Sequence, residues 1–563
     1  MTNPVIAIGL DAGEPSVIEK WMSQGYLPNL NRLREQGIYG RLDNFRDANV
    51  ETAWTTFATG CSPWTTGCWV HMGFREGTYE TQSLTSYDYQ KCPPFYALGE
   101  NYRVAAFDVP QVRLTDKING VQVAAWGAHS PQVPSGSMPE SILPELVEQY
   151  GTHPTLHKDY ATCLDLKKTL ALEEKFKQGT ARRAAICQDL LQRENWDLFL
   201  TVFNDPHSAG HLFWQLSQPE HPLYEALKPR VSHDPLLEVY QAMDNAIGEI
   251  LSKAPDNAHI VIFSAHGMGP ATVDLPSFVF LPEFLYRFSF PGKWALTHGN
   301  PSEPLPPLTT KMNWNWWERH VWGTKYDPNP IRRFLRCQTP SRIFRVIEPW
   351  LESTQKSDLM SPFQFQRLKR QGKVDFIPWN PAQWYQPVWH SMKAFALPSF
   401  AEGYIRINLK GREPQGIVEP SEYDAICEEL CEKLHALKDA RTGIPMVHKI
   451  VRTRKDPMER NPKLSPADLI VVWQDEYATD TMDSPDYGRF GPLPPYRAGS
   501  HRHEGFILAC GSGIEAGSSL SEGHVLDLAP TILELMGAPI PEHLEGKPLS
   551  LLKSEAVVDG ART

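Results

Sequence analysis

The chain has 563 residues, of which 41% are hydrophobic and 21% charged, as in a globular protein with one large core or about two to three domains. Its net charge of −11 argues against a general surface for polyanions, so no nucleic-acid polymer is expected as a partner. No signal-peptide pattern and no run of about 18 apolar residues occurs, and the nine cysteines include no Cys-x-x-Cys pair. We therefore expect a cytoplasmic protein with reduced thiols and no membrane-spanning helix.

Short apolar runs alternate with helical patterns through the first half of the chain. Buried strands are predicted at residues 5–10, 102–108, 120–126, 196–203 and 259–264. The apolar spacing of amphipathic helices is found at residues 173–192 and 236–251. This alternation predicts an α/β fold, in which helices cover both faces of a mostly parallel sheet.

Residues 271–400 have a different composition, rich in proline and tryptophan and without strand–helix alternation. We interpret this segment as an inserted cap over the mouth of a site. Its tryptophans either line an aromatic substrate pocket or pack the insert onto the sheet. The predicted organisation is a first part of the α/β core at 1–270, the cap at 271–400, a second part of the core at 401–553 and a disordered tail at 554–563. Within the second part, strands are predicted at 403–413 and 467–473 and a helix at 422–437.

Acidic and histidine side chains stand beside several of the predicted strands. In an open α/β sheet, sites form in the crevice beyond the carboxyl ends of the strands. Residues from separate strands can therefore meet there, and these residue types are metal ligands. The sequence thus predicts one metal site, whose candidate ligands are Asp11, His207, His211, His266, His501 and His503.

Several stretches occur in an order that resembles the alkaline phosphatase superfamily, in its type I phosphodiesterase/nucleotide pyrophosphatase branch. Among them are GLDAGEP, GYLPNLNRLREQG, AWTTFATGCSP, DLFLTVFNDPHSAGHLFW, VIFSAHGMG, PADLIVVW and GSHRHEGFILACGSGI. The resemblance implies a three-layer α/β/α sandwich and hydrolysis of a small phosphorylated substrate at two metals, usually zinc. One metal is held by an aspartate and two histidines, and the other by two aspartates, one histidine and a nucleophilic Thr or Ser.

The chain keeps only part of the ligand set that the resemblance implies. Asp11, His211, His266 and His501 match ligands of the family, whereas His207 stands in place of an aspartate. A second ligand aspartate is also missing, because Ala265 precedes His266 where the family pattern reads Ser-Asp-His-Gly.

The expected nucleophile is also replaced. It lies nine residues before the Thr of a Thr-Gly pair, and counting back from Thr59 gives Val50, which has no hydroxyl group. Thr52 is the nearest hydroxyl that could substitute, provided that the backbone shifts. Glu51 is a possible replacement metal ligand. Both residues are alternatively ordinary polar residues at the start of a helix.

These replacements favour a remodelled site over a decayed one. His207, His211 and His501 form a neutral set of three imidazoles that suits zinc, and also iron or copper. His503 would face the same side of an extended strand as His501 and add a fourth imidazole. Asp11 and His266 either hold a second metal with Glu51 or act as a base and an acid.

Three functions follow from this reading. The first is a metal-dependent hydrolase that cleaves a phosphate ester or diester by metal-activated water, with Asp11, His266 or Thr52 as catalytic residues. The second is an enzyme with one His-bound metal that performs non-phosphoryl biosynthetic or oxidative chemistry. The third is a catalytically inactive binding protein, because a fold does not by itself determine an activity.

Overall fold

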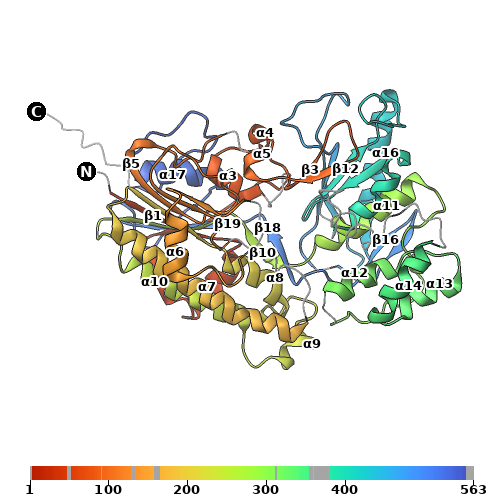
Figure 1. Cartoon of the computed structure of the whole chain (residues 1–563), viewed down its shortest axis with the longest axis horizontal. Coiled ribbons are helices and arrows are strands. Elements are labelled where there is room, and N and C mark those ends of the chain that lie inside the picture. The colour runs from red at the N-terminus through yellow and green to blue at the C-terminus, as the bar shows by residue number, and fades with distance from the viewer. Residues whose placement is uncertain are drawn as a thin grey trace, which may run out of the picture.

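The computed structural model describes residues 3–46, 52–89, 92–127, 133–156, 165–310, 314–353, 359, 380–477 and 479–552. These residues form two lobes that lie side by side (Figure 1). The larger lobe contains a nine-stranded sheet, and the smaller contains a four-stranded sheet.

The nine-stranded sheet is parallel at its centre. Its strands, in spatial order, are β20 (Ser518–Ser519), β2 (Ile38–Leu42), β19 (Gly505–Cys510), β9 (His259–Ser264), β1 (Val5–Leu10), β8 (Leu198–Phe203), β5 (Gly99–Phe107), β6 (Ile118–Ala124) and β7 (Gly136–Met138). The five strands from β9 to β6 run parallel to one another, whereas β19 and β7 pair with them in the antiparallel direction. The prediction of a mostly parallel sheet is confirmed.

Helices cover both faces of this sheet, because alternate residues of a strand point to opposite sides. In β1, Ile6, Ile8 and Leu10 belong to one hydrophobic cluster, and Val5 and Ala7 belong to another. The first cluster includes residues of α1 (Pro15–Ser23), α2 (Pro28–Gln36), α6 (Ile142–Tyr150), α7 (Leu166–Arg193), α8 (Asp205–Ser217) and α10 (Pro235–Leu251). The second includes residues of α3 (Ala53–Thr59) and α17 (Leu528–Leu535). The predicted three-layer α/β/α sandwich is therefore confirmed.

The smaller lobe is built around an antiparallel sheet. Its strands, in spatial order, are β11 (Ala394–Leu397), β12 (Gly403–Ile407), β15 (Leu469–Trp473) and β14 (Val447–Arg452). The helices around it are α11 (Leu281–Ser289), α12 (Trp314–Gly323), α13 (Pro330–Gln338), α14 (Ser341–Ser353) and α16 (Tyr423–His435). Four tryptophans of the predicted cap are buried in the core of this lobe: Trp317, Trp322, Trp384 and Trp389. These four side chains pack the insert, as one of the two alternatives for this segment expects.

The boundary predicted at residue 401 differs from the sheet pairing. The strands predicted at 403–413 and 467–473 correspond to β12 and β15, which pair with each other and not with the central sheet. The chain returns to the central sheet only with β19. An alternating apolar pattern identifies a strand, but it carries no information about which sheet the strand joins.

Shorter helices and strands lie between these elements. They are α4 (Pro63–Thr66), α5 (Ser86–Tyr89), α9 (Tyr224–Leu227), β3 (Met72–Phe74), β4 (Thr81–Ser83), β10 (Gly267–Pro270), β13 (Lys438–Asp439), β16 (Met482–Ser484), β17 (Gly488–Phe490) and β18 (Gly499–Arg502). The antiparallel pair β10–β18 follows β9, precedes β19 and lies beside α8 (Figure 1). It therefore carries the chain from the small lobe back to the carboxyl end of the central sheet.

A buried polar contact fixes the start of α8. Asp205, the first residue of the helix, accepts a hydrogen bond from Thr180 Oγ1 at 3.1 Å and contacts His153 Nε2 at 3.1 Å. His153 Nδ1 accepts from the Thr155 backbone N–H, so its Nε2 carries the proton that is donated to Asp205. Gly179 in α7 leaves room for this ring, because a Cβ atom there would lie 1.9 Å from His153 Nε2.

We predict that Gly179→Ala destabilises the protein, although alanine is the better helix former. Helix propensity alone predicts a gain of about 1 kcal/mol, whereas displacement of a packed side chain costs about 1–3 kcal/mol. Urea unfolding monitored by circular dichroism measures the difference, with Gln178→Ala on the exposed side of α7 as the control. An increase in stability for Gly179→Ala would mean that His153 does not need this space.

Candidate metal centre

The turn from β8 into α8 brings two histidines onto one face of a helix. β8 ends at Phe203 and α8 begins at Asp205. Residues four apart in a helix are neighbours on its surface, so His207 and His211 project in the same direction. Both side chains are buried, with exposures of 4% and 0%.

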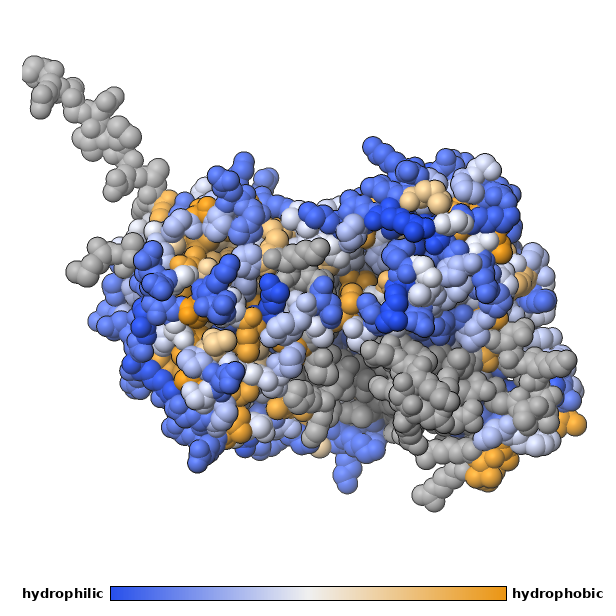
Figure 2. Space-filling view, turned by 45° about the horizontal axis from the view of Figure 1, so that its top comes forward, coloured by the Kyte–Doolittle hydropathy of each residue, from blue (hydrophilic) through white to orange (hydrophobic). Residues whose placement is uncertain are grey.

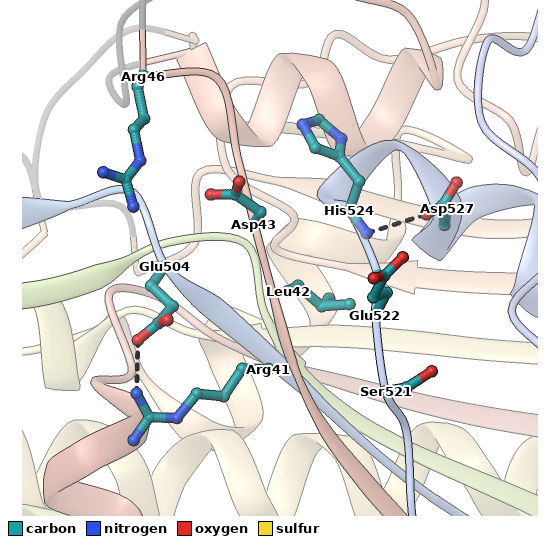
Figure 3. Close-up of a pocket in the computed structure, with 10 residues that line it drawn as sticks. Arg41, Leu42, Asp43, Arg46, Glu504, Ser521, Glu522, His524 and Asp527 are labelled. Carbon is teal, nitrogen blue, oxygen red and sulfur yellow. Dashed lines mark hydrogen bonds and ion pairs between the residues drawn. The ribbon is translucent and has the colours of Figure 1, made fainter.

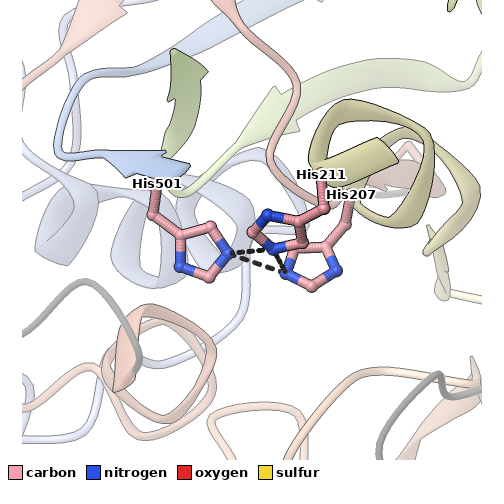
Figure 4. A group of neighbouring side chains, drawn as sticks. All are labelled: His207, His211 and His501. Atoms are coloured by element: carbon pink, nitrogen blue, oxygen red, sulfur yellow. Dashed lines mark hydrogen bonds between the residues drawn. The ribbon is translucent and has the colours of Figure 1, made fainter. Parts of the chain in front are cut away.

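His501 approaches these two histidines from β18 (Figure 4). The Nε2 atom of His501 lies 2.7 Å from Nε2 of His207 and 3.2 Å from Nε2 of His211. The two helical Nε2 atoms are 3.2 Å apart. We call these three residues the histidine triad.

The geometry of the histidine triad fits a bound cation. Ligand nitrogens at about 2.0–2.1 Å from a tetrahedral zinc are about 3.3 Å apart, close to two of the three separations observed here. A neutral imidazole carries one proton on its two nitrogens, and His211 Nδ1 lies 2.7 Å from the carbonyl oxygen of Gly499. Since this carbonyl can only accept, Nδ1 donates and Nε2 presents a lone pair to the triad. Such a backbone contact typically orients a metal-binding histidine.

An arginine that sequence reasoning missed lies beside the histidine triad. Arg497 Nη1 is 3.2 Å from His211 Nε2, and the guanidinium forms two hydrogen bonds to Asp274, at 2.9 and 3.0 Å. Both partners of this ion pair are buried. The carboxylate balances the arginine charge, which lowers its repulsion towards a cation at the triad. No motif in the sequence connects these two distant residues.

Asp11 and His266 form a second group next to the histidine triad. Asp11 follows β1, and its Oδ1 accepts a hydrogen bond from Trp54 Nε1 at 2.7 Å and lies 3.6 Å from His266 Nε2. The ring centroids of His266 and His501 are 4.8 Å apart. Among the hydrogen bonds of the described residues, none involves a ring nitrogen of His266. The structure thus brings both of these predicted residues to the same place as the triad.

Burial changes the protonation of this second group. It raises the pKa of Asp11 to about 7, against the effect of the Trp54 hydrogen bond, which lowers it. It lowers the pKa of His266 to about 3, because the charged imidazolium is poorly solvated. Of this pair, Asp11 and not His266 therefore has the pKa near neutral pH.

The other candidate residues have different positions. His503 is not part of the histidine triad; its ring nitrogens lie 3.9 Å from Asp475 and 4.0 Å from Asp43. β18 ends at Arg502 and the chain bends at His503, which lines the same pocket as His501 without joining the histidine triad. Thr52 is buried at the start of α3, two residues before Trp54. Val50 and Glu51 lie outside the described residues.

One member of the histidine triad, His501, lines a pocket of about 170 Å³ between the lobes. His501, Phe45 and Arg46 line it from the large lobe, and Glu402 and Trp473 line it from the small lobe. A second pocket, of about 620 Å³, is also lined by Arg46 (Figure 3). Most of its lining is charged, and Arg41 is already paired with Glu504 there. Arg46 is exposed and borders both pockets, so it is a candidate cation for an anionic substrate at the first one.

We predict that the protein purifies with about one zinc per chain, and that His211→Ala or His501→Ala lowers this to below about a tenth. Removal of one of three ligands leaves too few donors for stable binding. His503→Ala is the matched control and should retain the metal, because His503 lies outside the triad. Elemental analysis of the purified variants gives the result. Loss of metal from His503→Ala alone would contradict the assigned ligand set.

We also predict that Asp11→Asn stabilises the metal-free protein. The folded state holds the Asp11 proton more tightly than the unfolded chain, so stability is lost as the pH rises from about 4 towards 7. Asparagine does not ionise, and its side-chain oxygen can still accept from Trp54. The advantage of the variant should therefore grow by about 2 kcal/mol between pH 5 and pH 8.

Thermal unfolding in the presence of a chelator, at both pH values, measures this change. Asp43→Asn, on an exposed carboxylate, is the control. An advantage that is independent of pH would show that Asp11 is already ionised at pH 5.

In the described part of the chain, no helix combines the length and the apolar character needed to cross a bilayer.

A comparison with curated protein sequences gives no significant match. Among solved structures, phosphonoacetate hydrolase from Sinorhizobium meliloti 1021 is similar with 14% identity and a TM-score of 0.47, over 95% of this chain and 96% of that one. Murine ectonucleotide pyrophosphatase/phosphodiesterase 5 is similar with 10% identity and a TM-score of 0.46, over 96% of both chains. Values this low carry no argument about activity.

The sequence itself provides the assignment. Residues 5–322, more than half of the chain, match the profile of a protein family described as type I phosphodiesterase/nucleotide pyrophosphatase. This range includes Asp11, His207, His211 and His266. The chain therefore belongs to the type I phosphodiesterase/nucleotide pyrophosphatase family.

Proposed function

We propose that the protein hydrolyses a small phosphate ester or diester with one divalent metal, zinc, held by His207, His211 and His501. The observation that carries this proposal is the convergence of three Nε2 atoms, at separations of 2.7, 3.2 and 3.2 Å. Family membership supports the reaction class. The metal, when bound, would polarise a phosphoryl oxygen and lower the pKa of a water molecule.

The residues around the histidine triad each have a distinct part in this proposal. Arg46 lines the pocket that His501 borders, so it would bind the phosphate group of the substrate. Asp11 and His266 are buried beside the triad, where a proton can be held close to the reacting groups. The burial of His207 and His211 keeps bulk water away from the inner side of the site.

Water, rather than a side chain, is the nucleophile that we propose. The position that the family pattern assigns to the nucleophile holds Val50, which cannot form a covalent phospho-enzyme. Thr52 precedes the first residue of α3 and is only 1% exposed. Its hydroxyl would have to reach the pocket from this buried place. A single displacement by water removes this requirement.

We predict that Thr52→Ala keeps kcat/KM for bis(4-nitrophenyl) phosphate within about threefold of the wild type, whereas His211→Ala lowers it by at least about 100-fold. A diester with a chiral phosphorus centre provides a second readout. One direct displacement inverts the configuration, and two successive displacements through an enzyme-bound ester retain it.

Retention of configuration, together with loss of turnover in a Thr52→Ala variant that still holds its metal, would identify Thr52 as the nucleophile. The three-nitrogen ligand set also suits iron and copper. A protein that contains one of these redox metals and cleaves neither monoesters nor diesters would favour the alternative of non-phosphoryl chemistry. A protein that binds no metal after reconstitution would favour a binding role.

A further inference from the structure

The hairpin of α13 and α14 on the small lobe has large apolar side chains on its surface. Ile331, Phe334, Ile343, Val346 and Trp350 are each between 55% and 78% exposed. Figure 2 shows apolar side chains at its lower right, where these two helices lie. Isolated exposed apolar residues are common on proteins, but five within two consecutive helices form a patch that needs an explanation.

The spacing places these residues in one stripe on each helix. Ile331 and Phe334 are three residues apart in α13, and Ile343, Val346 and Trp350 are three and four residues apart in α14. Only Thr339 and Pro340 separate the two helices, which pack against each other. The patch is therefore a feature of the hairpin as a whole. We call it the hairpin patch.

The hairpin is basic in an acidic chain. Residues 330–353 contain five arginines and two glutamates, which gives a net charge of +3, whereas the whole chain has a charge of −11. In α13, Arg332 is paired with Asp327 at 3.0 Å, Arg333 is half-buried against the ring of Tyr326, and Arg336 is buried beside Asp327. Helices that lie in the surface of a membrane combine Lys and Arg with exposed Trp, Phe and aliphatic residues in this way.

We propose that the hairpin patch binds the surface of a lipid bilayer that contains anionic headgroups. The apolar stripes would enter the boundary between headgroups and acyl chains, with the net positive charge of the hairpin beside the headgroups. Net positive charge on this segment is complementary to the negative surface of such a membrane. This association is peripheral and does not depend on the hydrolytic activity proposed above.

Sedimentation of the purified, metal-loaded full chain with vesicles tests the proposal. Vesicles of phosphatidylcholine with about 30% phosphatidylserine should bind the protein, binding should weaken as salt increases, and pure phosphatidylcholine should bind little. Val346→Asp combined with Trp350→Asp should lower binding at least about tenfold, because two apolar side chains that would enter the bilayer are replaced by charges. Ile417→Asp is the matched control, since Ile417 is also an exposed apolar residue of the small lobe.

Metal content and melting temperature show that each variant is folded. Absence of wild-type binding to anionic vesicles would overturn the proposal, and so would equal binding to neutral vesicles. Light scattering after size-exclusion chromatography measures the oligomeric state, and so tests whether a second copy of the chain covers the hairpin patch instead of a membrane. A wild-type dimer that becomes a monomer in the Val346→Asp variant, without vesicle binding by either protein, would assign the patch to a second copy of the chain and would also overturn the proposal.

Discussion

The site depends on the close approach of three imidazole nitrogens that belong to two distant parts of the chain. His207 and His211 lie four residues apart in α8, and His501 lies on β18. A neutral imidazole carries one proton on its two nitrogens, so three Nε2 atoms at this distance cannot satisfy one another fully, and the surrounding structure must hold them in place. It does so through Asp205, which anchors the start of α8, and through Gly499, whose carbonyl orients His211.

Burial of the ionisable side chains of Asp11 and His266 reduces the stability of the folded protein. Asp11 and His266 are both almost fully enclosed, and burial moves their pKa values in opposite directions, towards the neutral form of each. Uncharged groups are easier to bury, but an ionised carboxylate is the better partner for a cation. Active sites frequently retain such groups at the expense of stability. The helix-borne Trp54 compensates in part by donating a hydrogen bond to Asp11.

Much of the core was predictable from the sequence, because buried parallel strands are short apolar runs with sharp ends. β1 and β9 have the predicted bounds, and the spacing of His207 and His211 identifies one face of a helix. Contacts set by tertiary structure were not predictable. The pairing of Arg497 with Asp274, and the bend that takes His503 away from the triad, depend on where distant segments meet. For the same reason, the sequence did not reveal that the strands predicted after residue 401 join the sheet of the small lobe.

The position of His501 has a further consequence for the architecture. Most of the small lobe lies in the chain between His266 and His501, where the paired strands β10 and β18 connect it to the large lobe. The earlier strands β3 and β4 also contact this lobe. A metal bound by the histidine triad would connect α8, which packs beside β10 where the chain enters the small lobe, to β18, where the chain leaves it. Closing a long loop restricts the unfolded chain more than the folded one, so the ion would couple the order of the small lobe to the large one. A chain that ends before β18 would retain two of the three histidines, but it would lose the closure.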